Sequence, residues 1–555
     1  MASIAETADR FVRTDRPGLA IRIRHPGLAA IGWSIALAVL LPILALAAIA
    51  ARGSGDLWPH LIRYVVPQAV AETTLLLVGT GVLVIVIGTG TAWLVTVFRF
   101  PGRRMLSWAL LLPLAIPVYI VAYSYLDLLH PAGPVQTVLR DLFGVASARD
   151  LRFPEIRSLG GCILLFGFVL YPYVYLNVRI SLLMQSAEQF EAAQIDGASS
   201  ARIFAQIALP LARPAIAAGT GLALMESLAD LGASELLGVQ TLTVSVYVTW
   251  VTRGSVEGAA QIALAMLVPV AALLWLVNRS RVEPGPAAAS PPPAPRRLGP
   301  VAGILAALAC TLPIVVGFLL PALHLAILSA ARMAERGVSP MLLCYAWNSA
   351  RFAAIATLIA VASGFLLALC QRYRRRDGPT RVVQTGYAVP GTVLAVGLLG
   401  MIALADAAIG LTGFDGLRGT MLLTSMVGVV IAYLARFLAI PASGLEAGYA
   451  RLPRELDEAA QSAGAPIATV ARHIHWPLLQ PAIRAAALLM FIECIKELPA
   501  TLLLRPLNIE TLATFLYGEA SRGVYEDGAI AALAMLGLGL LPLIFLSRSE
   551  RFSRM

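Results

Sequence analysis

One segment of the chain occurs twice, and this duplication constrains the fold more than any other feature of the sequence. Each copy contains Glu-Ala-Ala, then a glycine, then a proline. The residues are Glu191, Ala192, Ala193, Gly197 and Pro210 in the first copy and Glu458, Ala459, Ala460, Gly464 and Pro477 in the second. Equivalent residues are 267 positions apart throughout. The chain is therefore predicted to contain two copies of one module, each carrying the same polar segment.

Both copies lie among long apolar runs. Apolar residues make up 58% of the chain and charged residues 13%, and a helix of about twenty apolar residues crosses a bilayer. Six such runs in each half predict an all-α integral membrane protein of about twelve transmembrane helices in two parallel six-helix repeats. The Pro-rich third and ninth runs are expected to be kinked or broken. The runs lie near 28–50, 70–98, 106–129, 159–184, 212–236 and 258–278, and near 300–329, 348–370, 384–406, 419–441, 481–504 and 527–547.

Arginines concentrate in alternate connections between these runs, which predicts that both termini and both polar segments are cytoplasmic. The formal net charge of +10 is then an orientation bias and does not indicate nucleic-acid binding. The predicted organisation is a cytoplasmic N-terminal segment (1–27), a first transmembrane domain (28–281), a Pro-rich cytoplasmic linker (282–298), a second transmembrane domain (299–548) and a cytoplasmic tail (549–555).

The polar segments, residues 187–210 and 454–477, are each expected to form a short helix, a glycine turn and a second short helix. The small alanines beside each glutamate permit close approach of a partner surface, and the glycine permits a backbone conformation that other residues avoid. The alternative is that these segments are ordinary interfacial helices capping the bundle.

At these residues the chain resembles the inner-membrane permeases of binding-protein-dependent ABC importers, whose EAA loop has the same pattern. The first copy fits fully, and the second has Trp476 where leucine is usual. The resemblance implies a type I importer permease fold in the bacterial inner membrane, two ATPase subunits docked on the loops, and a periplasmic solute-binding protein. The residues implied to carry ATPase coupling are Glu191, Ala192, Ala193, Gly197, Glu458, Ala459, Ala460 and Gly464.

ATP hydrolysis is predicted to reside in a separate chain. The only lysine is Lys496, and Glu497 follows it, so the Gly-Lys-Ser/Thr of a P-loop is missing. The five cysteines and six histidines show no metal-ligand spacing, and no cofactor is expected. We therefore expect a transport subunit surrounded by lipid, not an enzyme.

A second repeated element places acids inside the membrane. Glu226 and Asp230 in the fifth run match Glu493 and Glu497 in the eleventh, and Lys496 lies beside them. Such intramembrane charges commonly face a bundle interior or a substrate path. Either these residues line a pathway for a hard cation, which prefers oxygen ligands, or they pair with Lys496 or cap helices broken at Gly232 and Pro499.

The stretch 496–506, Lys-Glu-Leu-Pro-Ala-Thr-Leu-Leu-Leu-Arg-Pro, resembles the ferric-iron-type fused permeases. This resemblance implies iron(III) as solute, and related permeases carry thiamine, phosphonates or other small solutes. Intramembrane acids disfavour an anion. An ion-gradient-driven secondary transporter also tolerates twelve helices in two repeats, but it does not explain the duplicated loops.

Overall fold

The computed structural model describes residues 26–145, 147, 153–185, 187–279, 295–374, 378–411 and 426–552. The predicted N-terminal segment 1–27 and linker 282–298 lie largely outside these residues, and the predicted tail 549–555 is described as far as residue 552. Within them the chain is helical, apart from a two-residue parallel pairing of β1 (Phe98–Arg99) with β2 (Arg296–Arg297). The prediction of an all-α membrane protein is thereby confirmed.

The twelve predicted runs fall on helices or on bent pairs of helices. In the first half the elements are α2 (Pro26–Ala50), α3 (Leu57–His60), η1 (Leu61–Val65), α4 (Val66–Val97), α5 (Arg103–Ala109), η2 (Leu112–Ala115), α6 (Val118–Leu128), α7 (Pro134–Phe143), α8 (Leu159–Leu183), α9 (Ala187–Ile195), α10 (Ser200–Ile203), η3 (Phe204–Ala208), α11 (Leu209–Ala229), α12 (Gly232–Leu236), α13 (Leu242–Val251) and α14 (Val256–Arg279).

The second half repeats this order. Its elements are α15 (Pro300–Ile314), η4 (Val315–Leu319), α16 (Leu320–Arg336), α17 (Pro340–Arg374), α18 (Gly378–Gly386), α19 (Gly391–Leu411), α21 (Val427–Phe437), α22 (Ala439–Ala450), α23 (Glu455–Ser462), α24 (Ile467–Val470), η6 (Ala471–His475), α25 (Trp476–Lys496), α26 (Pro499–Leu504), α27 (Leu512–Arg522) and α28 (Tyr525–Phe552).

Eight helical segments are long and apolar enough to cross a membrane, and three bent pairs raise the number to eleven among the residues searched. α28 coincides with the twelfth predicted run. The third and ninth runs are broken as expected, with bends of 91° and 107°. The bends lie at Pro117 and Pro390, because proline has no N–H to continue a helix.

Three predicted runs are displaced in the structure, and the eleventh, expected at 481–504, is a continuous helical segment over Ile467–Lys496. The fifth, expected at 212–236, is a continuous helical segment over Ser200–Ala229 that takes in the second part of the polar loop. The tenth, expected at 419–441, is the bent pair Val427–Ala450, and residues 412–425 lie outside the described residues. In each case the helix continues beyond the apolar stretch toward or into the neighbouring polar loop, where hydropathy gives no signal.

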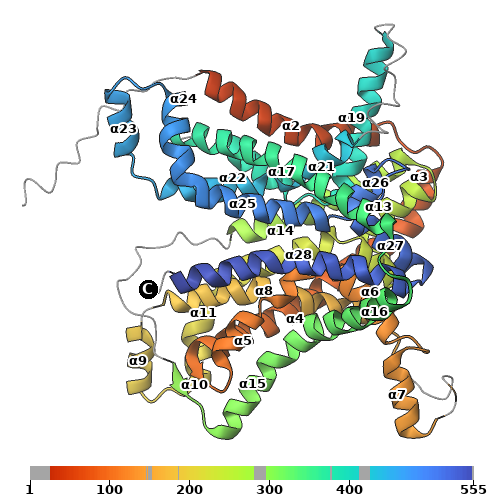
Figure 1. Cartoon of the computed structure of the whole chain (residues 1–555), viewed down its shortest axis with the longest axis vertical. Coiled ribbons are helices and arrows are strands. Elements are labelled where there is room, and N and C mark those ends of the chain that lie inside the picture. Colours follow the sequence, from red (N-terminus) through yellow and green to blue (C-terminus); the bar gives the residue numbers. More distant parts are fainter. Residues whose placement is uncertain are drawn as a thin grey trace, which may run out of the picture.

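The first membrane helix of each half packs on the opposite half (Figure 1). α2 lies against α17, α18 and α19, whereas α15 and α16 lie against α4, α5 and α6. Glycines allow backbone contact at both crossings. A Cβ on Gly397 would lie 2.1 Å from the carbonyl oxygen of Pro42, and a Cβ on Gly317 would lie 2.1 Å from that of Phe168. Each half therefore packs against the first membrane helix of the other half.

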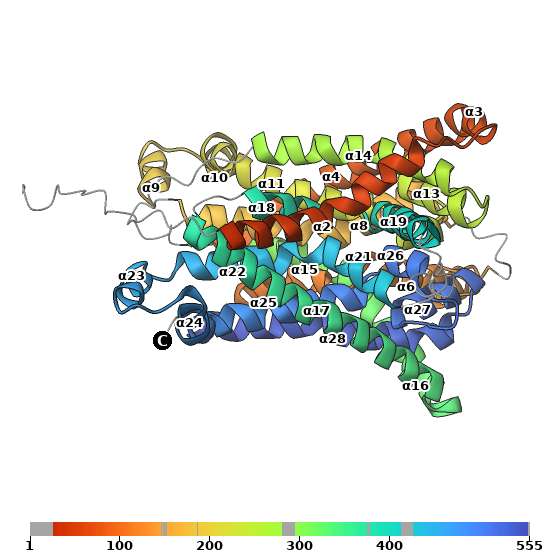
Figure 2. The ribbon, with the colours of Figure 1, turned by 90° about the horizontal axis from the view of Figure 1, so that it is seen from above.

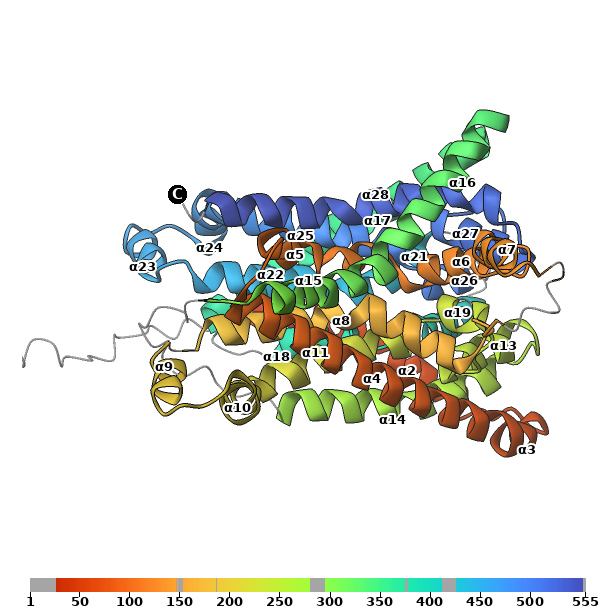
Figure 3. The same cartoon turned by 90° about the horizontal axis from the view of Figure 1, so that it is seen from below.

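The polar loops lie at one end of the bundle. α9, α10, α23 and α24 are at the left in Figure 2, and α3, α13 and α27 are at the opposite end. The view from below in Figure 3 shows the same separation. The two repeats are thus parallel, as predicted.

Candidate functional site

The two polar loops have the same backbone geometry. In each, a short helix ends at a glycine with positive φ, +75° at Gly197 and +78° at Gly464. The residue after each glycine donates its N–H to the last alanine of the repeated motif, at 2.9 Å to Ala193 O and 3.0 Å to Ala460 O. This hydrogen bond closes a Schellman-type helix end, for which glycine is the favoured residue. A second short helix follows, α10 or α24.

The residues of the repeated motif face solvent. Glu191 and Ala192 on α9, and Glu458 and Ala459 on α23, are exposed at the end of the bundle. Trp476, the departure from the usual pattern, opens α25 and is 43% exposed. Its ring packs edge-on against Phe365 of α17, with ring centroids 5.5 Å apart.

An aromatic cluster holds the first loop to the bundle. Phe190, the residue before Glu191, is only 3% exposed. Its ring lies 6.3 Å from that of Trp93 on α4, and Trp93 also packs against Phe204 at 5.0 Å and Phe98 at 6.1 Å. Burial of these large apolar side chains stabilises the loop base.

An ionic cluster holds the second loop. Asp457, the residue before Glu458, is 7% exposed and accepts a hydrogen bond from Arg372 Nε at 2.7 Å. His475 Nε2 lies 2.6 Å from the other carboxylate oxygen, and the Tyr373 hydroxyl donates to that same oxygen at 3.2 Å. Arg372 also donates to the Tyr449 carbonyl at 2.9 Å. The Asp457 carboxylate thereby joins the second loop to η6 and to the end of α17. Arg372 extends this connection to the end of α22.

Sequence reasoning missed both clusters. Phe190 and Asp457 are equivalent in the 267-residue register, but neither stands out in its own segment. Asp457 belongs to a run of acids on a polar helix, and its burial depends on Arg372, 85 residues earlier in the chain. His475 is one of two neighbouring histidines, and the pattern indicates no partner for it.

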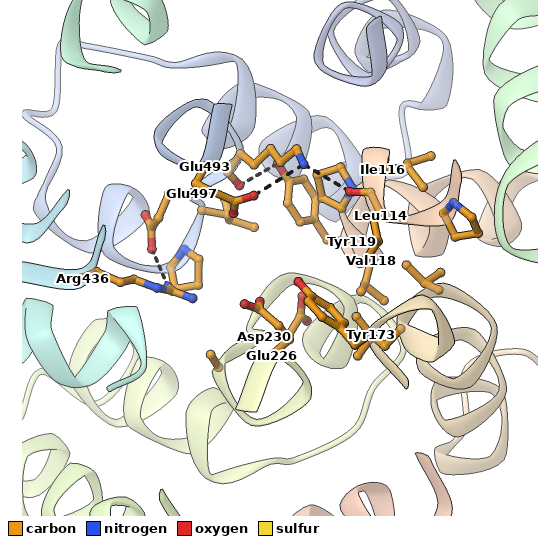
Figure 4. A pocket seen from close by; sticks show the side chains of 18 of the residues that line it. Leu114, Ile116, Val118, Tyr119, Tyr173, Glu226, Asp230, Arg436, Glu493 and Glu497 are labelled. Atoms are coloured by element: carbon orange, nitrogen blue, oxygen red, sulfur yellow. Dashed lines mark hydrogen bonds and ion pairs between the residues drawn. The ribbon is translucent and has the colours of Figure 1, made fainter. Parts of the chain in front are cut away.

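A cavity of about 120 Å³ lies between the halves and is lined by all five predicted pathway residues (Figure 4). These residues are Glu226, Asp230, Glu493, Lys496 and Glu497. Arg436 also lines the cavity, together with apolar residues of the broken third span. The structure therefore brings the two acidic elements, 267 residues apart, to one place.

Two of the four carboxylates cap helices. Asp230 Oδ1 accepts from the backbone N–H of Ala233 at 2.8 Å and of Ser234 at 3.3 Å, at the start of α12. Glu497 accepts from the backbone of Ala500 at 3.0 Å and of Thr501 at 2.9 Å, at the start of α26. The capping interpretation therefore describes the contacts of these two residues, which satisfy N–H groups that a helix start leaves unpaired.

The other two carboxylates make side-chain contacts in the cavity. Glu226 accepts a hydrogen bond from the Tyr387 hydroxyl at 2.8 Å, and Tyr387 belongs to the opposite half. Glu493 lies 3.8 Å from Lys496 Nζ. Lys496 in turn donates to the Leu114 carbonyl of the first half at 3.3 Å. Leu114 and Tyr387 are equivalent, each three residues before the proline of a broken span, so both breaks carry a contact across the interface.

Arg436 is a cavity residue that sequence reasoning missed. It lies buried on α21 and forms an ion pair with Glu497 at 3.1 Å. Gly391 leaves room for this pair, since a Cβ there would lie 2.5 Å from Glu497 Oε1 and 2.8 Å from Arg436 Nη1. The sequence offers one signal for it, because Arg436 is the single arginine in the apolar stretch 427–437. The repeat offers no second signal, because the equivalent position 267 residues earlier is Val169.

The cavity therefore carries four acidic and two basic side chains. Among the described residues no three His, Cys, Asp or Glu side chains are grouped closely enough to hold a metal ion. A cage of four carboxylates for a hard cation is thus not assembled in this conformation.

Comparison with known proteins gives a consistent family. The family model described as "Binding-protein-dependent transport system inner membrane component" matches residues 84–281. The molybdenum transport system permease ModB of Escherichia coli K12 is 33% identical over 208 residues, covering 35% of this chain and 86% of ModB. The Fe(3+)-transport system permease FbpB 2 of Haemophilus influenzae is 22% identical over 517 residues, covering 88% of this chain and 91% of FbpB 2. The probable ABC transporter permease y4fN of Sinorhizobium fredii is 23% identical over 95% of this chain and 96% of y4fN.

Proposed function

Because the chain belongs to the family of inner membrane components of binding-protein-dependent transport systems, we propose that it is the fused permease subunit of an ABC importer for a small inorganic ion, with iron(III) as the first candidate. It is a multi-pass protein of the bacterial inner membrane. Its partners are a separate ATPase and a periplasmic solute-binding protein.

The proposed ATPase-docking surfaces are the two polar loops, one for each of two ATPase subunits. The observation that carries this proposal is their shared geometry: two exposed Glu-Ala-Ala segments with the same glycine turn at one end of the bundle. Glu191, Ala192, Ala193 and Gly197, with Glu458, Ala459, Ala460 and Gly464, are proposed to transmit ATPase closure to the membrane helices. That end is then cytoplasmic, and both termini lie on the same side.

Solute passage is proposed to follow the cavity between the halves. Contacts between the halves there include those of Tyr387 with Glu226 and of Lys496 with the Leu114 carbonyl. Both join the acidic element of one half to the broken span of the other. Rocking of one half against the other would part these contacts and leave Glu226 and Glu493 to meet the solute.

Iron(III) as solute is supported by the full-length likeness to FbpB 2, which covers both halves. Oxygen ligands from Glu226 and Glu493 suit a hard cation in transit. A molybdate- or sulfate-like oxyanion is the second candidate. It is favoured by the higher identity to ModB. Arg436 and Lys496 supply positive charge in the cavity, whereas Asp230 and Glu497 already accept hydrogen bonds from helix-start N–H groups.

Co-purification tests the importer assignment. The tagged chain, extracted gently from its native membrane, is expected to bring down a P-loop ATPase, and Glu191→Lys/Glu458→Lys should lose it. The matched control is Glu188→Lys/Glu455→Lys, which makes the same charge change on the same two helices. Absence of an ATPase, with uptake that collapses on protonophore addition while ATP is maintained, would instead establish a gradient-driven secondary transporter.

Uptake into proteoliposomes that contain the assembled importer and its binding protein distinguishes the solutes. Radioactive iron(III) citrate and radioactive molybdate are supplied separately, with and without ATP inside. ATP-dependent accumulation of iron alone supports the first candidate, and accumulation of molybdate alone replaces it with the second. ATP-dependent accumulation of thiamine or a phosphonate, with iron, molybdate and sulfate all inactive, would reject an inorganic ion as substrate class.

A further inference from the structure

Two cavities lie beside the first turn of α2 at the loop-bearing end of the bundle. The larger, about 1350 Å³, is enclosed by α2, α17 and the second polar loop. The smaller, about 340 Å³, lies between α2, the end of α17 and the start of α18. Leu28 lines both cavities, and its carbonyl accepts a hydrogen bond from Cys370 Sγ of α17 at 3.0 Å. The first turn of α2 thus forms a shared wall.

The larger cavity is an apolar groove. Its walls include Ile31, Phe365, Leu366 and Trp476, and all but Phe365 of these are exposed. Arg472 is its one charged lining residue among those described. An acyl chain seated here removes this apolar surface from water or loose lipid without burying an unpaired polar group.

The smaller cavity is basic. Arg374 and Arg381 line it, and no described lining residue is acidic. The N-terminal end of the 25-residue helix α2 adds the positive end of its dipole. Trp33, also in the lining, is 51% exposed, and tryptophan concentrates at the membrane–water interface. A basic pocket between helices at this level suits the headgroup of an anionic lipid.

We propose that the two cavities together bind one anionic glycerophospholipid, with its phosphate at Arg374 and Arg381 and its acyl chains in the groove. Gly464, Ala465 and Ile467 of the second polar loop line the same groove. The lipid would therefore contact the loop directly from the membrane side. This inference rests on the membrane location of the chain and not on the identity of the solute.

The start of α15, which corresponds to the start of α2, has different surroundings. At the corresponding end of α15, Arg296–Arg297 pair with Phe98–Arg99, and Leu298 N donates to Arg99 O at 3.2 Å. Backbone hydrogen bonds between these two segments therefore occupy the position before α15. Residues 1–25 precede α2 and carry five arginines against three acidic residues, Glu6, Asp9 and Asp15, so their net positive charge disfavours them in an arginine-lined pocket. Those arginines are Arg10, Arg13, Arg16, Arg22 and Arg24.

Brominated lipids test the proposal, because bromine quenches tryptophan fluorescence only at short range. The full chain is reconstituted in nanodiscs of phosphatidylcholine containing brominated phosphatidylglycerol or brominated phosphatidylcholine. The Trp33 signal is obtained by subtracting the Trp33→Phe variant. Quenching by the anionic lipid is expected to reach half-maximum at a mole fraction at least threefold lower than quenching by the neutral lipid.

Arg374→Gln/Arg381→Gln should abolish this preference, whereas Arg374→Lys/Arg381→Lys should retain most of it. The control is Arg451→Gln/Arg454→Gln, which removes two exposed arginines at the same end but outside both cavities. Equal quenching by the two lipids, or a preference that survives the Arg374/Arg381 glutamine variant, would overturn the proposal. A preference that appears only after deletion of residues 2–24 would identify the N-terminal segment as the occupant and overturn it too.

Discussion

Phe190 and Asp457 occupy equivalent positions in the two polar loops, yet Phe190 packs among aromatic rings while Asp457 binds Arg372 and His475. The same contrast recurs at the cavity. Asp230 contacts backbone N–H groups at its helix start, whereas the equivalent Glu497 also pairs with Arg436. At these two places the first half uses apolar packing and backbone contacts, and the second uses buried charge.

This difference shows that the duplicated backbone does not require one particular side-chain solution. An aromatic cluster gains stability from each buried ring separately. A buried ionic cluster is strong only while every member has its partner, because a charge left alone in a low-dielectric interior is costly. The second loop should therefore respond more sharply to single substitutions than the first.

The largest effect is expected when Phe190 is replaced by aspartate, the residue that occupies the equivalent position in the second loop. Phe190→Asp places a carboxylate against Trp93 in a buried aromatic cluster, and we expect a loss of about 5 kcal/mol in the free energy of unfolding. The thermal unfolding of the purified chain in detergent measures this loss. Phe190→Leu, which keeps an apolar side chain but a smaller one, is the control and should cost less than Phe190→Asp. A tolerated Phe190→Asp would show that the aromatic cluster does not hold the loop.

Asp457→Ala should have the second-largest effect, a loss of about 3–5 kcal/mol in the free energy of unfolding, because it leaves Arg372 and His475 buried without their common partner. Thermal unfolding and ATPase co-purification should both decline. Adding Arg372→Met should recover part of the loss, since the unpaired charge is then removed as well. If the double variant is no better than Asp457→Ala, the cluster contributes through packing and not through charge.

Glu497→Gln is expected to cost about 3 kcal/mol, because Arg436 loses its counter-charge. The matched change in the other half, Asp230→Asn, should cost only about 0.5–1 kcal/mol, because asparagine also caps a helix start. The two variants are compared by thermal unfolding under identical conditions. Equal losses would mean that the ion pair to Arg436 adds nothing to the cap.

The smallest effect is expected for His475→Asn. It removes a hydrogen bond to Asp457 but leaves the Arg372 ion pair, so a loss of about 1 kcal/mol is reasonable. The same thermal assay measures it. A loss as large as that of Asp457→Ala would place the imidazole, and not the arginine, at the centre of the cluster.

The sequence predicted whatever depends on local pattern or on the repeat. The spans, the parallel repeats, the break in the third and ninth runs and the helix–glycine–helix of each loop follow from hydropathy, proline and the 267-residue register. It did not decide whether Asp230 and Glu497 cap helices or line a path, because a carboxylate at that depth satisfies both descriptions. The contacts of Arg436 and Asp457 were missed, since each partner lies tens of residues away and neither alters the periodicity of its own helix.

The packing of α2 on the opposite half bears on how the protein is made. α2 ends at Ala50, but the helices that receive it, α17 to α19, are complete only at Leu411. At about 5–20 residues per second, ribosomal synthesis reaches that point on the order of tens of seconds later. During this interval the surface of α2 that will pack on α17, α18 and α19 is in contact with lipid, whereas α14, its neighbour in the same half, is complete at Arg279. The 25 residues of α2 contain no charged side chain, so it is stable in the bilayer on its own until its partner helices emerge.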